Sequence, residues 1–413
     1  MDEIEVPPYF LCPISLEIMK DPVTVSTGIT YDRESIEKWI FSGRNNTCPV
    51  TKQALNSDTD LTPNHTLRRL IQSWCTMNAS HGVERIPTPK PPVSKAQIAK
   101  LLNDATSPHS QIKCLRRLRS MASTSESNKR SLEAAGAAEF LASLVIFNTN
   151  NNNTSTEAVV YEDGFDSTRA RDDALGILHN LQLSDKGLRS LVGKNGEFVD
   201  SLMRVIQSAS YESQTYAVFL LKSIFEVADP MQLTNLKPQF FSELVQLLHD
   251  QISSKASKAT LQILITLSPL GRNRIKAVEA GAVSVLIDQL LDSSEKRACE
   301  MMLVLLDQLC QCAEGRAELL KHGAGLAIVS KKILRVSKVG SERAVRILFS
   351  ISKFSATPSV VQEMLQLGVV AKLCLVLQVD SGSSAKERAR EILKLHARHW
   401  KNSACTVLSS DPC

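Results

Sequence analysis

The sequence is poor in aromatic residues and has no long apolar run. Aromatic side chains make up 5% of the 413 residues, and no basic run is interleaved with them. Because nucleic-acid-binding surfaces usually combine basic and aromatic side chains, a nucleic-acid partner is not expected. No stretch reaches the roughly 18 uncharged apolar residues of a membrane-spanning helix, so a transmembrane protein is not expected either.

The cysteines of the N-terminal region lack the spacing of a zinc site. Structural zinc sites take ligands in pairs about 2 to 4 residues apart, because one tight turn must aim both ligands at the ion. In the first 80 residues the candidates are Cys12, Cys48, His65 and Cys75, which are 36, 17 and 10 residues apart in chain order. We therefore expect neither a metal nor a cofactor.

The cysteines also bear on the compartment. All ten are scattered through a chain that is large enough to fold without disulfide bonds. The chain starts with an acidic, proline-containing segment, MDEIEVPP, rather than with an export signal. We therefore expect reduced thiols and a cytoplasmic protein, with the nucleus and the periphery of the plasma membrane as further locations.

The first 80 residues predict a small α+β domain that begins with a hairpin. Residues 23–25 and 29–31 flank Ser26-Thr27-Gly28, which is typical of a short turn with glycine at a positive φ. Cys12 has no neighbouring histidine to lower its pKa, so we interpret it as a buried structural thiol rather than as a nucleophile.

Two helices are expected after the hairpin. Asp32 should cap the first, whose apolar positions Ile36, Trp39 and Ile40 recur at helical spacing and which ends at Gly43. The second begins at Pro63-Asn64, with Asn64 as a structural residue, and buries one face. That predicted face comprises Leu67, Leu70, Ile71 and Trp74.

Charged residues are available to order the loops of this domain in place of a metal. These residues can form ion pairs with one another and hydrogen bonds from their side chains to the loop backbone. The pattern alone does not say which pairs form. The acidic candidates are Asp21, Asp32, Glu34 and Glu37, and the basic ones are Arg33, Lys38, Arg68 and Arg69.

Five motifs follow one another in a region that covers about residues 6 to 80. They are CPIS, EIMKDPV, GITYDRESIEKWI, CPVTKQ and TPNHTLRRLIQSW. Together they resemble the plant U-box, the zinc-free relative of the RING domain in ubiquitin ligases. The resemblance implies a domain without a catalytic nucleophile, which docks a ubiquitin-conjugating enzyme that carries a ubiquitin thioester and orders it for attack by a substrate lysine.

The resemblance also implies a docking surface on two loops and a helix. Its residues are Ile14, Leu16, Trp39, Pro49 and Val50. Apolar tips on rigid loops make a small patch, and interfaces below about 1,200 Å² tend to be transient, as a carrier that must leave and recharge requires. Pattern alone favours core positions for Ile14, Leu16 and Trp39, whereas the resemblance favours docking.

Lys52 occupies a position at which some U-boxes have an arginine that bridges the conjugating enzyme and ubiquitin. Lysine keeps the charge but lacks the planar fork of arginine, so in this role it should activate the thioester less strongly. A solvated surface lysine is the alternative.

A glycine-containing phrase, as in VEAGAVSVLIDQLL, recurs beyond a proline-rich linker, IPTPKPPVSK. Its glycines are separated by 60, 85, 42 and 45 residues, and halving 85 predicts a further repeat near Pro238. A low-complexity insertion at 148–166 accounts for the step of 60. A helical period near 42 is typical of an armadillo or HEAT solenoid. The glycines are Gly136, Gly196, Gly281, Gly323 and Gly368.

The repeated phrase resembles armadillo repeats in particular. Glycine or proline ends a short helix, a second helix follows, and a longer one such as RACEMMLVLLDQLC or ERAVRILFSISKF lines the groove. Armadillo import receptors carry ladders of Trp and Asn on the long helices. This chain has no Trp between residues 75 and 399, and Asn180 alone echoes the ladder, so an import receptor is disfavoured.

The two regions differ in charge. Residues 1–80 contain 7 basic and 10 acidic residues, net −3, whereas the remainder contains 41 and 33, net +8. A basic solenoid could attract acidic partner segments or an acidic membrane surface. A plain solvated surface explains the excess equally well.

Two Thr-Pro pairs are candidate sites for proline-directed kinases, at Thr62 and Thr88. A phosphate on Thr62 would add negative charge beside the start of the second helix and could alter pairing between U-boxes. A plain helix-entry residue is the alternative for Thr62.

We therefore expect a mostly α protein with four segments: a small zinc-free, RING-like α+β U-box at 1–80, a linker at 81–95, an armadillo solenoid at 96–400 and a tail at 401–413. The solenoid should have about six repeats, with an Asn-rich insertion near 148–167. The resemblance to plant U-box/armadillo ubiquitin ligases implies a RING-type ligase that forms no thioester of its own and acts in stress or immune signalling. Its expected partners are a charged conjugating enzyme, a substrate on the repeats, and a further U-box in a homo- or hetero-oligomer. A non-catalytic armadillo scaffold is the alternative.

Overall fold

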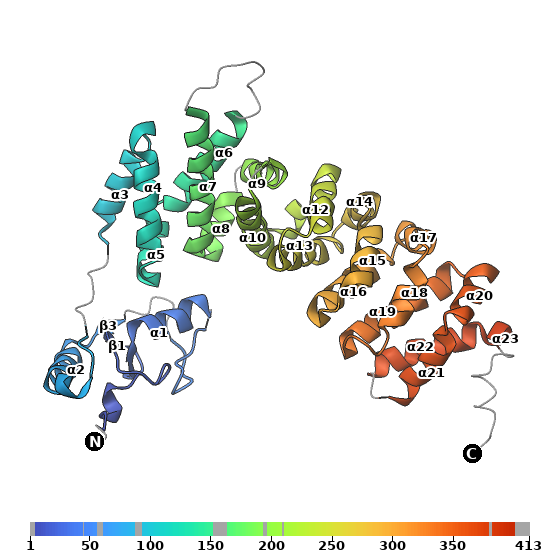
Figure 1. The fold of residues 1–413 in the computed structure, drawn as a ribbon, viewed down its shortest axis with the longest axis horizontal. Helices are drawn as coiled ribbons and strands as arrows, with labels where there is room; N and C mark the ends of the chain where they lie inside the picture. Colours follow the sequence, from blue (N-terminus) through green and yellow to red (C-terminus); the bar gives the residue numbers. More distant parts are fainter. Residues whose placement is uncertain are drawn as a thin grey trace. The chain divides into compact units, whose positions relative to one another are not determined.

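The computed structural model describes residues 5–43, 45–55, 61–86, 93–151, 163–192, 196–208, 210–379 and 382–400. These residues form two compact units, Met1–Gly187 and Leu188–Cys413. Their helices and strands are labelled in Figure 1.

The first unit begins with a single 3₁₀ turn, Pro8–Phe10, and a three-stranded antiparallel sheet of order β2-β1-β3. The strands are β1 (Pro22–Thr24), β2 (Thr30–Asp32) and β3 (Thr62–Pro63). The predicted hairpin is confirmed: β1 and β2 pair, and Gly28 has a φ of 81° in the turn between them. Glycine reaches this left-handed conformation without the strain that a Cβ would bring.

Two helices pack on this sheet. The first is α1 (Arg33–Glu37), which continues as a π-helical turn, η2 (Lys38–Ser42). The second is α2 (His65–Met77), followed by a 3₁₀ turn, η3 (Ala79–His81).

The two predicted helix caps behave differently. Asn64 precedes α2, and its side chain accepts a hydrogen bond from the Leu67 amide at 3.0 Å. Asp32 precedes α1 but makes no such cap, which corrects the expectation from the sequence. Its carboxylate instead accepts the amides of Lys20 and Asp21, because the folded loop brings these two donors within reach.

The core of this small domain uses one face of each helix. Ile36 of α1 and Ile71 of α2 are buried, as predicted, but Leu70 is 53% exposed, so its predicted burial is wrong. Ile71 and Cys75, one turn apart, take the buried positions of α2, which turns Leu70 to solvent. Trp39, Ile40, Leu67 and Trp74 pack on the rim of the core. The fully or nearly buried members are Phe10, Cys12, Met19, Val23, Val25, Tyr31, Ile36, Cys48, Leu55, Ile71 and Cys75.

The rest of the first unit is helical. It contains α3 (Lys95–Asp104), α4 (Pro108–Ala122), α5 (Glu126–Ala134), α6 (Ala137–Asn151) and α7 (Asp163–Leu181). The insertion predicted at 148–166 lies between α6 and α7, and residues 152–162 of it fall outside the described residues. Both of its ends belong to helices, because extending an existing helix costs little once its first turn has formed.

The next helix, α8 (Asp185–Val192), spans the boundary between the units. The second unit continues with helices only, in the part that the structure describes. In chain order these are α9 (Glu197–Ser208), α10 (Tyr211–Val227), α11 (Pro230–Leu233), α12 (Pro238–Asp250), α13 (Ser254–Leu267), α14 (Asn273–Glu279), α15 (Ala282–Asp292), α16 (Lys296–Leu309), α17 (Ala313–Lys321), α18 (Gly325–Lys332), α19 (Lys338–Phe354), α20 (Pro358–Gln366), α21 (Val369–Gln378), α22 (Ser383–Leu395) and α23 (Ala397–Trp400).

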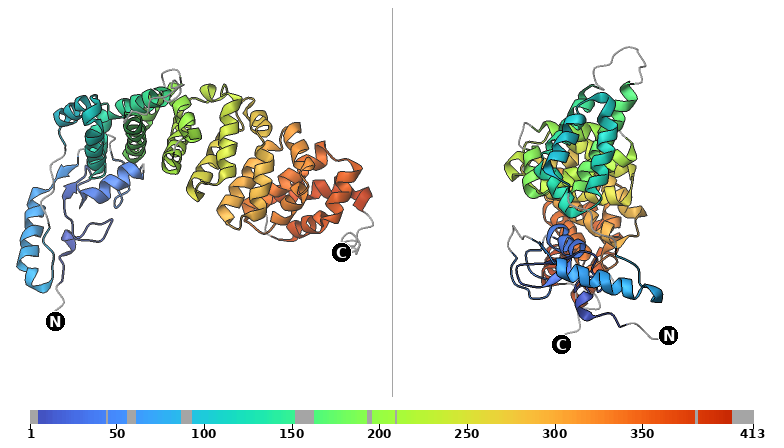
Figure 2. Two further views of the ribbon diagram at one scale, coloured as in Figure 1. Left: turned by 45° about the horizontal axis from the view of Figure 1, so that its top comes forward. Right: turned by 90° about the vertical axis from the view of Figure 1, so that its left-hand side faces the viewer.

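These helices recur in sets of three, as armadillo repeats do. Among the described residues the sets are α5–α7, α8–α10, α11–α13, α14–α16, α17–α19 and α20–α22. Within the second unit the long third helices α10, α13, α16, α19 and α22 each pack on the next, from the yellow-green to the red part of the ribbon (Figures 1 and 2). The repeat predicted near residue 238 is confirmed, since Pro238 occupies the first position of α12.

The glycines of the repeated phrase mostly allow a left-handed turn between two helices. Gly136, Gly196, Gly281 and Gly368 have φ between 68° and 87°. The phrase around Gly323 differs: the short helix there ends without a left-handed residue, and Gly325 begins the next helix. A Cβ on Gly325 would clash with the carbonyl oxygen of Leu319, so the absence of a side chain allows this close approach.

Within the described ranges, no single helix is long and apolar enough to cross a membrane. By length and composition, α20 and α21 pass that test only as a pair, which is bent by 66°.

Candidate functional site

Two loops of the N-terminal domain have the same backbone architecture. Loop 1 (residues 11–18) and loop 2 (residues 47–54) each have a Cys-Pro pair at their second and third positions and are closed by an antiparallel bridge. In loop 1 the Cys12 amide donates to the Glu17 carbonyl at 2.8 Å, and the Leu16 amide donates to the Cys12 carbonyl at 2.8 Å.

Loop 2 repeats these contacts residue for residue. The Cys48 amide donates to the Gln53 carbonyl at 2.8 Å, and the Lys52 amide donates to the Cys48 carbonyl at 2.9 Å. Leu16 and Lys52, which hold equivalent positions, both have a φ of 60°. A left-handed conformation costs a residue with a side chain roughly 1–2 kcal/mol, so closure of each loop must offset this strain.

The loop tips carry exposed apolar side chains. Leu16 is 74% exposed and Val50 is 52% exposed, which are large values for such residues in a small domain. Ile14 and Trp39 are half-buried on the rim of the core, and Pro49 is half-buried as well.

Trp39 joins the helix to loop 2. Its indole Nε1 donates to the Thr47 carbonyl at 2.8 Å, and the ammonium of Lys52 lies 5.9 Å from the centre of its ring. Trp39 and Lys52 are therefore brought together at loop 2, whereas Ile14 and Leu16 belong to loop 1.

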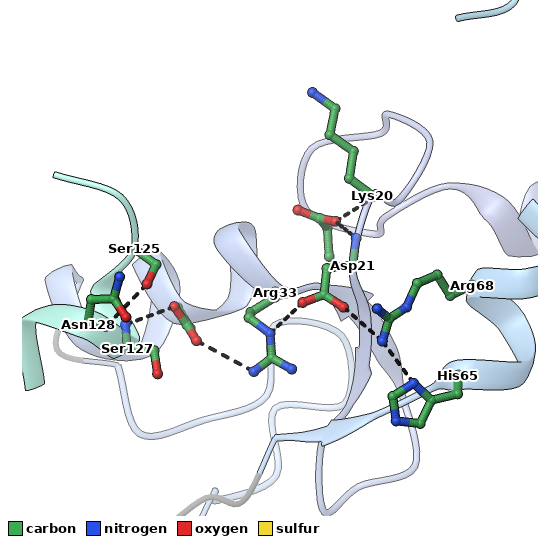
Figure 3. Close-up of polar contacts among 10 residues, drawn as sticks. Lys20, Asp21, Arg33, His65, Arg68, Ser125, Ser127 and Asn128 are labelled. Carbon is green, nitrogen blue, oxygen red and sulfur yellow. Dashed lines mark hydrogen bonds and ion pairs between the residues drawn. The ribbon is translucent and has the colours of Figure 1, made fainter. Parts of the chain in front are cut away.

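A network of charged side chains fixes the segment next to loop 1 (Figure 3). Asp32 Oδ1 accepts the amides of Lys20 at 2.7 Å and of Asp21 at 2.9 Å, and the Asp32 amide donates to Cys12 Sγ at 3.3 Å. Arg33 Nε donates to Asp21 Oδ2 at 2.7 Å. The Asp32 carboxylate therefore connects the hairpin to the segment next to loop 1 through two backbone amides.

Asp21 is the centre of the ion pairs. Besides Arg33, it faces Arg68 of α2, whose guanidinium lies 3.6 Å from Asp21 Oδ1 (Figure 3). Asp21 and Arg68 are each 17% exposed at the side chain and Arg33 is 27% exposed, so these pairs are largely screened from water. Glu34 and Lys38, in contrast, pair at 2.6 Å on the open surface of α1.

Loop 2 is held by a tyrosine and a thiol instead. The Tyr31 hydroxyl and Cys48 Sγ are 3.0 Å apart, the Val50 amide donates to the Tyr31 hydroxyl at 3.3 Å, and the Thr27 hydroxyl donates to Cys48 Sγ at 3.4 Å. Burial raises the pKa of Tyr31. Burial opposes ionisation of Cys48 too, but hydrogen bonds from Thr27, Thr51 and Tyr31 outweigh it and lower the pKa of this thiol to about 6. Tyr31, Thr27, the Cys48 thiol and the Val50 amide thus form one hydrogen-bonded cluster that holds loop 2.

Comparison with known proteins identifies both parts of the chain. The family model of the U-box domain matches residues 6–80, and that of the plant U-box protein ARM repeat region matches residues 96–411. The E3 ubiquitin-protein ligases PUB22 and PUB23 of Arabidopsis thaliana are each 57% identical, over 98% and 100% of this chain and 97% and 98% of their own length. The chain belongs to the plant U-box/armadillo ubiquitin ligases.

As a member of this family, the chain is an E3 ubiquitin-protein ligase that consists of a U-box and an armadillo solenoid. An engineered protein of known crystal structure shares the fold, with a TM-score of 0.50 and 20% identity over 74% of this chain and 69% of its own. That likeness concerns the fold alone. U-box ligases work with conjugating enzymes, and armadillo repeats bind substrates.

Metal ligands do not cluster in the described part of the U-box. Within the described residues, no three or more His, Cys, Asp or Glu side chains lie close enough to hold an ion. Cys12 and Cys48 are fully buried, and both sulfurs accept hydrogen bonds from the protein. The polar contacts named above therefore order the two loops.

Sequence reasoning missed the residues that hold loop 2. The sequence pattern places Tyr31 and Thr27 only in the predicted hairpin, and Cys48 only among candidate metal ligands with the wrong spacing. The signal for them is the similarity of CPIS in loop 1 to CPVT in loop 2. Two loops of the same backbone conformation each need their own set of supporting side chains. The support of loop 1 was predicted as a set of charges, but not as pairs.

Of the two candidate phosphorylation sites, the structure describes Thr62. Thr62 lies in β3, pairs with Thr24 and is exposed. Thr88 lies outside the described residues.

Proposed function

We propose that the U-box of this ligase docks a charged ubiquitin-conjugating enzyme through the tips of loops 1 and 2. Ubiquitin then passes directly to a lysine of a substrate held by the armadillo repeats. One observation carries this proposal: two loops of equal backbone geometry each present an exposed apolar side chain, Leu16 and Val50. Ile14, Trp39 and Pro49 would complete the patch around them.

Rigid loops suit this role because they lose little freedom on binding. Each tip is closed by its own backbone hydrogen bonds and by a separate polar support. Binding energy is therefore not spent on ordering the loops, and a small apolar patch can suffice for a transient complex.

The burial of the U-box thiols supports direct transfer from the conjugating enzyme. A nucleophilic cysteine must be reached by the thioester, but Cys12, Cys48 and Cys75 are at most 1% exposed. The U-box would act by holding its partner, and the substrate lysine would be the attacking group.

Lys52 would assist at the edge of the patch. It is exposed and lies beside Trp39, so its ammonium can face carbonyl oxygens of the docked pair of proteins. It supplies charge without the two-pronged hydrogen bonding of arginine.

The cellular side of the proposal rests on the family. We place the ligase in stress or immune signalling, in the cytoplasm and in part at the nucleus or the plasma membrane. Association with a further U-box, homo- or heterotypic, and its control by phosphate on Thr62 or Thr88 belong to the same proposal. The alternative of a non-catalytic scaffold is not retained, because the full-length relatives are named as ligases.

The test is a ubiquitination assay with activating enzyme, a panel of conjugating enzymes, ubiquitin and ATP. Leu16→Ala and Val50→Ala should each lower self-ubiquitination at least about fivefold, because interface anchors contribute more than about 1 kcal/mol each. Leu70→Ala is the matched control, since Leu70 is an exposed leucine of the same domain outside the loops. Full activity of both loop variants would refute the docking surface.

A further inference from the structure

Helix α1 and its continuation η2 touch the first armadillo repeat as well as loop 2. Glu37 is 3% exposed, and its Oε2 accepts the Ser127 amide at 3.3 Å. Ser127 lies in the first turn of α5, next to the cap residue Ser125, which Figure 3 shows together with Asn128. A buried carboxylate thus meets the free amides at the start of a helix, a favourable place for negative charge.

A second contact lies one turn further along. The guanidinium of Arg130, on α5, lies over the ring of Phe41, on η2. Arg33, Glu37 and Phe41 follow at intervals of four residues and therefore share one face of the helix.

The opposite face of the same helix serves loop 2. Trp39 follows Glu37 by two residues, which turns its side chain by roughly 200°. Its indole bonds loop 2, as described above, and Leu16 and Val50 remain exposed while Glu37 contacts α5. The contact with the repeat thus leaves the loop tips free and does not block them.

Charged groups link this contact to the loop supports. Arg33 lies 3.7 Å from Glu37 Oε1 and 2.7 Å from Asp21 Oδ2, and Asp21 also faces Arg68 (Figure 3). The polar network that orders the segment next to loop 1 therefore runs without a break to the first turn of α5.

We propose that Glu37 is a positioning residue for ubiquitin transfer, which together with Phe41 fixes the U-box on the first armadillo repeat. The docked conjugating enzyme then has a set orientation relative to that repeat, and a restricted set of lysines is presented to the thioester. This inference rests on the proposed function, in which the loops dock the enzyme. Without the contact, the proline-rich linker alone would connect the two domains.

The first experiment measures amide hydrogen exchange in the full chain, over residues 33–43 and 126–134. Arg130→Ala is the chief variant, because Arg130 is exposed and its loss leaves the U-box sequence intact. Exchange should speed up in both segments in Arg130→Ala and in Glu37→Gln. Arg130→Lys, which keeps a cation over Phe41, should restore slow exchange. Arg117→Ala and Glu34→Gln, changes at exposed positions of α4 and α1, are the matched controls.

The second experiment maps the lysines modified in self-ubiquitination by mass spectrometry. The variants should spread modification over more lysines, while discharge of the conjugating enzyme to free lysine stays within about twofold of the wild type. If the wild-type chain does not stimulate discharge of the conjugating enzyme to free lysine, the docking proposal itself is refuted. Unchanged exchange in the variants, or faster exchange with an unchanged lysine pattern, would overturn the positioning role of Glu37.

Discussion

Replacing Asp21 with alanine should destabilise the U-box by removing the acceptor of two arginines. The variant loses the 2.7 Å hydrogen bond from Arg33 and the 3.6 Å pair with Arg68. A hydrogen bond to a charged partner contributes about 1.5–3 kcal/mol, and a longer, partly exposed pair about 0.5 kcal/mol. After a discount for the partial exposure of Arg33, the expected loss is about 2–3 kcal/mol, or roughly 30- to 150-fold in the folded-to-unfolded ratio.

Urea unfolding followed by tryptophan fluorescence is the appropriate assay. Two of the three tryptophans, Trp39 and Trp74, lie in the U-box, so the signal is dominated by this domain. With a urea dependence of about 1–2 kcal/mol per molar for a small domain, the midpoint should fall by roughly 1–3 M.

Glu34→Ala is the matched control, because Glu34 also pairs with a basic residue, Lys38, at 2.6 Å. Both partners are more than 60% exposed, so the loss should not exceed about 0.5 kcal/mol. Equal midpoints for the Asp21 and Glu34 variants would refute the argument that burial gives the Asp21 network its strength.

Four further predictions follow from the site and the repeats. Tyr31→Phe removes the acceptor of the Val50 amide and should lower ubiquitin discharge without unfolding the chain, as near-native circular dichroism would show. Lys52→Arg should raise or preserve discharge, and a clear loss would remove Lys52 from the mechanism. Thr62→Glu should weaken self-association in size-exclusion chromatography, and an unchanged elution profile would count against a phosphate switch. Burial lowers the pKa of His396 below its ordinary 6.5, so the unfolded chain binds the proton more readily. The stability of the last repeat should therefore be full above pH 6.5 and fall as the pH drops through it, and His396→Gln should flatten this dependence in thermal melts.

Local features of the fold could be predicted from the sequence. The hairpin around Gly28, the start of α2 after Asn64 and the start of α12 at Pro238 each depend on residues within a few positions of one another. Turn and helix-start preferences act at that range, so a single sequence is enough to reveal them.

The parts that failed depend on distant residues. Asp32 looks like a helix cap by its neighbours, but the folded hairpin offers it the amides of Lys20 and Asp21, 12 and 11 positions away. Leu70 fits the apolar period of α2, yet its burial is decided by where the sheet lies against that helix. The contact between Glu37 and Ser127 joins residues 90 positions apart and leaves no trace in either local pattern.

In loops 1 and 2, the residues that fix the backbone conformation differ from those that would contact a partner. Each loop keeps its conformation through main-chain bonds and a buried support, so the exposed side chains of Leu16, Val50 and Lys52 contribute little to it. Single changes at these positions can alter which carrier is preferred while the scaffold beneath stays intact. A ligase built in this way can diverge in its choice of partner one residue at a time, and the two tips can diverge independently.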